Sequence, residues 1–187
     1  MALKPYRQYS ETSVINGLFT FTSLNSADAG TIVRIVDNYV DGDGNSTNIL
    51  SDLSIVSNAV SPIIGPVGSV KPVDQYNDPY RPIGVILKNI ASEDENGNLL
   101  KFNPKKAAEM DIILPDIQAV PILTQGLIMV NGIDISDHTP ALGGAPAAGD
   151  TAYVGDNGSF ATDGIIPVGQ FLSTIDSEGY AIIRIQF

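Results

Sequence analysis

The chain has 187 residues, of which 43% are hydrophobic and none is cysteine, and its formal net charge is −11 at pH 7. This length is enough to bury a core in one large or two small domains, and the absence of cysteine excludes disulfides and thiolate chemistry. From residue 107 onward a single cation, Arg184, stands against ten acids, so DNA and RNA are not expected as direct partners. The 18 glycines and 12 prolines predict a turn-rich, mainly β protein.

The first 25 residues have a mixed character, and we predict an N-terminal arm at 1–25 followed by a β domain at 26–187. Residues 1–8 lack the apolar run of a secretion signal, and no run is long enough to cross a bilayer, so we expect a protein made in a cytoplasm with no membrane partner. Aromatic and Arg side chains are enriched at binding hot spots, which makes contact candidates of Lys4, Tyr6, Arg7 and Tyr9. A first strand packed on its own domain is the alternative, because Phe19-Thr20-Phe21-Thr22 alternates with period two.

The first clear strand of the β domain is Gly30–Val36, rich in β-branched residues. A long loop insertion is predicted at 38–80, where short apolar pieces are broken by prolines, and a strand resumes at Arg81–Lys88.

An oxygen-rich loop lies inside this insertion. The 1, 3, 5 spacing of a calcium loop is matched by Asp41, Asp43 and Asn45, with Asp52 at position 12. Ser46 replaces the required glycine at position 6, and no flanking helices are evident. This is a weak metal candidate beside the simpler interpretation as an acidic turn, and no cofactor is predicted.

Residues 90–102 are predicted to form a hairpin around Asn96-Gly97, a dipeptide suited to a type I′ turn. The acids Glu93-Asp94-Glu95 precede the hairpin tip, where we expect them to be well solvated and not to form a catalytic carboxylate pair. Asn103 and Pro104 predict the N-terminus of a short helix over 103–110.

Catalytic patterns are sparse. His138 follows Asp137 in a loop-like stretch, but adjacent side chains usually point apart, and no G-x-S-x-G motif is present. We therefore expect a protein that is not an enzyme.

The C-terminal region consists of short strands separated by tight turns. Its segments are AGDTAYV from Ala148, NGSF from Asn157, IPVGQFLST from Ile166 and GYAIIRIQF from Gly179, preceded by an apolar run at 120–130 that is predicted as one strand. In this order the segments resemble the C-terminal region of capsid decoration (cement) proteins of tailed bacteriophages. The resemblance covers residues 118–187.

This resemblance implies a structural virion protein that binds the outer surface of the capsid and stabilises contacts between major capsid protein subunits. It also implies a homo-oligomer, with a trimer at a threefold axis, and it makes the contact candidates of the N-terminal arm capsid contacts. The expected fold is an antiparallel β-barrel or β-sandwich with one short α-helix and an N-terminal arm.

Two segment pairs within the chain are similar, namely 29–34 with 148–153 and 82–87 with 167–172. They predict two related β lobes, 26–102 and 112–187, unless common strand and turn residues recur by chance.

Two other functions stay open. One is a different virion component, such as a head fibre base or a tail protein. The other is a carbohydrate-binding β-module, which is disfavoured because the chain has no Trp and only 7% aromatic residues for stacking on sugars.

Overall fold

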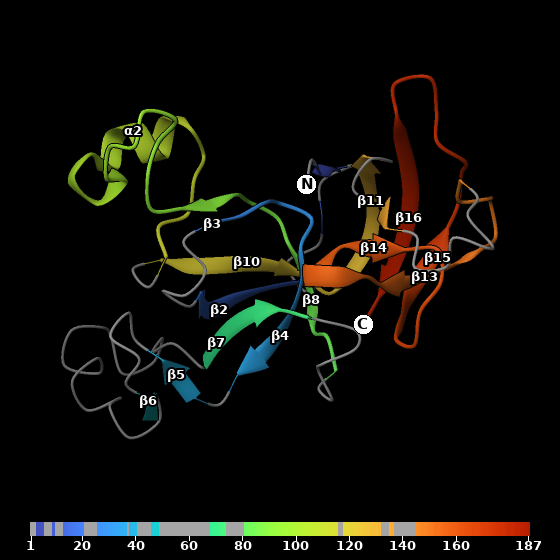
Figure 1. The fold of residues 1–187 in the computed structure, drawn as a ribbon, viewed down its shortest axis with the longest axis horizontal. Helices are drawn as coiled ribbons and strands as arrows, with labels where there is room; N and C mark the ends of the chain where they lie inside the picture. Colours follow the sequence, from blue (N-terminus) through green and yellow to red (C-terminus); the bar gives the residue numbers. More distant parts are fainter. Residues whose placement is uncertain are drawn as a thin grey trace.

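The protein is mainly β and has one short α-helix within the described residues, as the sequence predicts (Figure 1). The computed structural model describes residues 3–5, 9, 13–20, 26–36, 38–40, 46–48, 68–73, 81–115, 118–131, 135–136 and 145–187. Their strands form two large sheets and two small strand pairs, and one of the large sheets closes into a barrel.

The closed barrel has five strands in the order β10-β2-β7-β4-β8. All neighbours are antiparallel except β2 and β7, which run parallel. The strands are β2 (Val14–Thr20), β4 (Ile32–Val36), β7 (Gly68–Pro72), β8 (Gly84–Ile86) and β10 (Ala119–Leu123). β7 lies inside the segment that the sequence assigned to the 38–80 loop, because its only strongly β-forming inward residue is Val70.

The second large sheet has seven strands in the order β1-β11-β16-β15-β13-β14-β12, with β12 and β14 parallel. The strands are β1 (Leu3–Pro5), β11 (Gln125–Asn131), β12 (Ile135–Ser136), β13 (Thr151–Val154), β14 (Phe160–Ala161), β15 (Pro167–Phe171) and β16 (Tyr180–Gln186). The small pairs are β3 (Ser26–Ala27) with β9 (Ile90–Ala91), and β5 (Asn38–Val40) with β6 (Ser46–Asn48).

Both described strands of the predicted N-terminal arm pair within the chain. β1 lies antiparallel to β11, with Leu3 opposite Val130 and Pro5 opposite Ile128. β2 belongs to the closed barrel. The first twenty residues therefore contribute strands to both large sheets.

The two large sheets have the same order of strand pairing. In the barrel, β2 pairs with β10, β10 with β8, β8 with β4, and β4 with β7, which pairs in parallel with β2. In the second sheet, β11 pairs with β16, β16 with β15, β15 with β13, and β13 with β14, which pairs in parallel with β12. β12 follows β11 closely in the chain and takes the place of the second half of β2. We name β2, β4, β7, β8 and β10 the first repeat, and β11 to β16 the second repeat.

The equivalence extends to the pairing of single residues. Four residue pairs that lie opposite each other in the first repeat have counterparts in the second. Ile32–Val85 corresponds to Thr151–Gln170, Val33–Gly84 to Ala152–Gly169, Leu123–Val85 to Arg184–Gln170, and Ile15–Ile122 to Ile128–Ile183. The segments that are similar in sequence thus occupy the same places in the two repeats.

Two equivalent glycines mark the same close approach of strands. A Cβ on Gly84 would lie 2.5 Å from the carbonyl oxygen of Leu123, and one on Gly169 would lie 2.2 Å from that of Arg184. Leu123 and Arg184 are themselves counterparts, so both repeats require glycine where this strand passes its neighbour.

The inward side chains of each repeat form its core. Val33, Val70, Ile86, Val120 and Ile122 fill the first repeat, and their counterparts in the second are Ala152, Phe160, Phe171, Ala181 and Ile183. The core of the second repeat also includes Ile32, Val85 and Leu123, which come from the outer face of the first repeat. The two repeats are therefore joined by a shared hydrophobic core.

One connection of the first repeat carries an insertion, residues 87–118, between β8 and β10. It contains η2 (Leu100–Phe102) and α2 (Pro104–Glu109), and a small cluster of its own formed by Leu100, Ala107 and Leu114. In Figure 1 α2 lies at the opposite end of the long axis from β15 and β16. The helix begins as predicted, because the side chain of Asn103 accepts a hydrogen bond from the Lys106 backbone N–H at 3.3 Å and Pro104 is the first helical residue.

The predicted hairpin at 90–102 is present, but the prediction of a type I′ turn is wrong. Type I′ needs positive φ at both central residues, and in this turn only Gly97 has it, at 76°. The Gly97 N–H donates to the Asp94 carbonyl (3.0 Å), and the Asp94 N–H donates to the Asn98 carbonyl (3.0 Å). The loop therefore has three residues, with one left-handed glycine at its end.

The apolar run at 120–130 is also not one strand. It divides at Thr124 into β10, in the first repeat, and β11, in the second. At the division, the Thr124 N–H donates to Ser13 O (2.8 Å) and its carbonyl accepts from Phe187 N (3.1 Å), so the junction is held by both repeats.

Candidate functional site

No metal centre is found in the part of the chain that the structure describes. Within it, no three His, Asp or Glu side chains lie close enough together to hold a metal ion. The weak calcium candidates Asp41, Asp43, Asn45 and Asp52 lie outside the described residues, and so does His138.

Among the described helices, none combines the length and the apolar character that a transmembrane helix needs.

The N-terminal contact candidates have different outcomes. Lys4 lies in β1 opposite Met129, whereas Tyr6 and Arg7 lie outside the described residues. Tyr9 is half-buried and packs against the core of the second repeat. Its hydroxyl donates to the Leu127 carbonyl at 2.8 Å, and its ring covers Gly126, where a Cβ would lie 3.1 Å from Tyr9 Cε1. Tyr9 therefore fastens the N-terminal segment to β11.

Asp94 has the most strongly shifted pKa among the acids of the described residues. The sequence predicts a solvated side chain here, and this prediction is wrong because the side chain is buried. Its side chain is 1% exposed, and its carboxylate accepts hydrogen bonds from the backbone N–H groups of Asn96 and Asn98, both at 2.8 Å. It also forms an ion pair with Lys106, which belongs to α2. The ammonium group of Lys106 and these N–H donors hold the pKa of Asp94 well below its usual range. Folding of α2 back onto the hairpin is what buries this acid.

Asp94 has a structural role. Every hydrogen bond it accepts comes from its own turn or from α2, so it joins the hairpin to the helix of the insertion. The second repeat has the same turn without the helix: Asp176 accepts from the N–H groups of Glu178 and Tyr180, both at 2.9 Å, and Gly179 has φ 86°.

The insertion also presents apolar side chains to solvent. Phe102 is 77% exposed and lies beside the half-exposed Leu99, and the Lys101 ammonium lies 5.0 Å from the centre of the Phe102 ring. Leu99 forms an isolated antiparallel bridge with Glu93 across the hairpin, so these side chains extend from the hairpin and η2.

A four-residue row crosses the outer face of the second repeat. Its members are paired in the order Leu127, Arg184, Gln170 and Thr151, one each from β11, β16, β15 and β13. Leu127 is half-buried and the other three are exposed. We name these four residues the second outer row.

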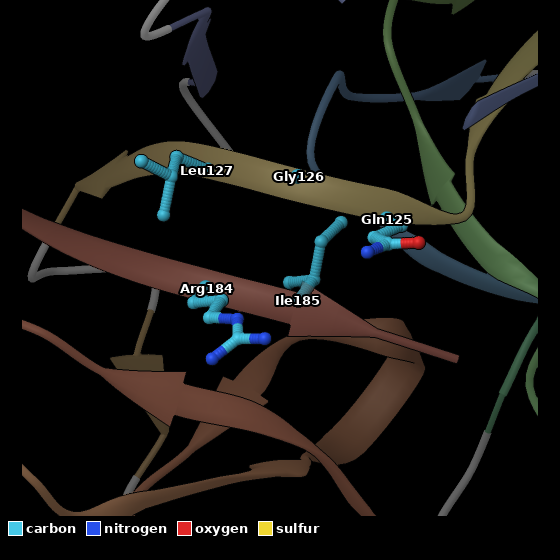
Figure 2. A pocket seen from close by; sticks show the side chains of 5 residues that line it. All are labelled: Gln125, Gly126, Leu127, Arg184 and Ile185. Carbon is cyan, nitrogen blue, oxygen red and sulfur yellow. The ribbon is translucent and has the colours of Figure 1, made fainter. Parts of the chain in front are cut away.

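The second outer row borders a shallow pocket on β11 and β16. The pocket is lined by Gln125, Gly126, Leu127, Arg184 and Ile185 (Figure 2). Gln125 shares the outer face with Leu127, two residues along β11, so amide and guanidinium groups stand on the same side of the sheet. Arg184 and Gln125 supply donors for a carboxylate or a carbonyl oxygen.

The equivalent row of the first repeat is apolar and covered. It contains Val14, Leu123, Val85 and Ile32, and all four belong to the hydrophobic cluster shared with the second repeat. We name these the first outer row. The turn at Asp156–Gly158, between β13 and β14, packs against this row. A Cβ on Gly158 would lie only 2.4 Å from the Ile32 carbonyl oxygen.

The sequence shows that Arg184 is the only cation from residue 107 onward, but it does not show that this residue belongs to a surface. A signal was present, since along β16 Ala181, Ile183 and Ile185 are buried and Arg184 between them is exposed. Finding the neighbouring residues required the register, because they come from strands that are distant in sequence.

No family model, no curated protein and no solved structure matches this chain.

Proposed function

We propose that this protein is a structural component of a tailed-phage virion that binds the outer surface of the capsid and stabilises contacts between major capsid protein subunits. The observation that supports this most is the C-terminal region. The four segments that carry the resemblance to decoration proteins form β13, β14, β15 and β16, consecutive strands of one sheet.

The architecture fits a role that needs no reacting group. The described residues contain two repeats of one β plan, joined by a shared core, and no metal-binding cluster. A ligand that binds only the assembled shell stabilises that shell through its binding free energy. A carbohydrate-binding module fits less well, because Phe102 is the one exposed aromatic side chain among the residues whose burial is described, and sugar sites rely on aromatic stacking.

The proposal is tested on particles of the phage that encodes the chain, prepared with and without its gene. We expect the chain on the exterior of mature heads in electron micrographs, as a homo-oligomer, and we expect heads without it to release DNA at a lower temperature. Finding the chain only on tails would favour the other virion components. Finding it absent from heads, with equal heat resistance of the two preparations, would refute the proposal.

A further inference from the structure

The first outer row is an example of this face of the repeat forming an interface. Val14, Leu123, Val85 and Ile32 lie side by side on four strands, and all of them are buried or half-buried against the second repeat. The contact uses a row of outward side chains that come from paired strands.

The second outer row has the same register but no cover among the described residues. Leu127, Arg184, Gln170 and Thr151 take the places of the four apolar residues, and the last three are exposed. Gln170 is already oriented, since its side-chain amide donates to the Gly149 carbonyl at 3.0 Å. The face therefore combines one aliphatic position with one charged and two polar positions.

Arg184 indicates which chemical group a binding partner would present to this face. It is the single cation in residues 107–187, and no carboxylate of the described residues lies within ion-pair distance of it, although Asp150, Asp176 and Glu178 are exposed in the same repeat. A guanidinium group pairs with carboxylates through two parallel hydrogen bonds, and Arg is enriched at interface hot spots. The pocket of Figure 2 leaves room beside it for such a group.

A second copy of this chain is the less suitable occupant. A twofold contact through this face would bring Arg184 of one copy toward Arg184 of the other, which like-charge repulsion opposes. The apolar first outer row of a second copy is already covered by its own second repeat.

We propose that the second outer row and its pocket form the face that binds the capsid, and that the shell protein presents a carboxylate to Arg184 there. This inference rests on the proposed function and names the surface through which it acts. An acidic shell surface would otherwise be repelled by a chain of net charge −11, so one correctly placed guanidinium group sets both the position and the orientation of binding.

The test measures co-sedimentation of the full chain with heads of the encoding phage that lack it. Arg184→Glu is compared with the wild type and with Lys101→Glu, a matched control that makes the same charge change on an exposed residue of the insertion. We expect Arg184→Glu to weaken binding at least about tenfold and Lys101→Glu to leave it within about twofold. Raising the salt concentration should reduce the difference in binding between the wild type and Arg184→Glu, because salt screens the charge that distinguishes them.

Each outcome decides the matter, once equal thermal unfolding has shown that both variants fold. Equal binding by Arg184→Glu and the wild type would overturn the assignment of this face and leave the proposed function standing. Wild-type chain that binds no heads would overturn both. An Arg184-dependent oligomer of the free chain in sedimentation equilibrium, with unchanged binding to heads, would assign the face to a second copy instead.

Discussion

The outer faces of the two repeats share one register and have opposite surroundings. Leu123 and Arg184 are counterparts on equivalent strands, but Leu123 is fully buried between the repeats whereas Arg184 is exposed. The same holds for Val85 and Gln170. One β plan therefore supports either an internal interface or a solvent-facing surface, and the side chains of one row decide which. Inward positions differ much less, because both repeats must fill a core.

The two Asp turns make a second comparison of the same kind. Asp94 and Asp176 accept the same pattern of backbone hydrogen bonds within their turns. Only Asp94 also meets a lysine, because only the first repeat carries a helix over its turn. A shared local motif thus acquires a tertiary role where an insertion covers it.

Exchanging the residue types of the two outer rows should change the free energy of unfolding more than any other substitution considered below. Leu123→Arg would bury an unpaired charge between the repeats, and we expect a loss on the order of 4 kcal/mol in the free energy of unfolding. Arg184→Leu changes an exposed side chain and should stay within about 0.5 kcal/mol of the wild type. Urea unfolding of both variants measures the difference. Similar stabilities for the two variants would mean that the outer rows are not in different environments.

Removing the carboxylates of the two turns should have a smaller and unequal effect. Asp176→Ala loses exposed backbone hydrogen bonds and should cost about 1 kcal/mol. Asp94→Ala should be more destabilising, because it also leaves Lys106 without its partner and opens the contact between hairpin and helix. Limited proteolysis that cleaves within 90–115 only in Asp94→Ala would locate the damage. Equal cleavage of both variants would argue against a role for α2 in stabilising the turn.

The smallest expected effect is on the pH dependence of stability, where the direction of the change follows from the lowered pKa of Asp94. The usual pKa of an Asp is 3.8, and that of Asp94 is lower in the folded protein. Above about pH 4 the acid is ionised in both states, so its ion pair and hydrogen bonds contribute fully to stability. As the pH falls below about 4 the unfolded chain takes up the proton first, and this contribution is progressively lost.

Thermal unfolding between pH 5 and pH 2 measures this loss. The stability of Asp94→Asn should fall less steeply than that of the wild type over that range. Parallel curves for Asp94→Asn and the wild type would show that Asp94 contributes nothing to acid sensitivity.

Much of the second repeat could be predicted because its strands are short, alternate in polarity and are separated by glycine turns. Each C-terminal segment contains one strand, and the helix at α2 begins where Asn103 and Pro104 indicated. β7 was missed because a strand that closes a barrel needs only one strongly apolar inward residue. The turn type at Asn96-Gly97 was wrong because the buried Asp94, which organises the loop, acts through side-chain contacts that the dipeptide does not reveal.

The β class, the positions of most turns and the concentration of negative charge in the second half could be predicted, because they depend on neighbouring residues and on composition. Three features became visible only in the folded chain: Thr124 separates two repeats, Asp94 is buried, and Arg184 lies beside Leu127 and Gln170. The physical reason is that strand register joins residues far apart in the chain. A row such as Leu127, Arg184, Gln170 and Thr151 has no local signature until the strands pair.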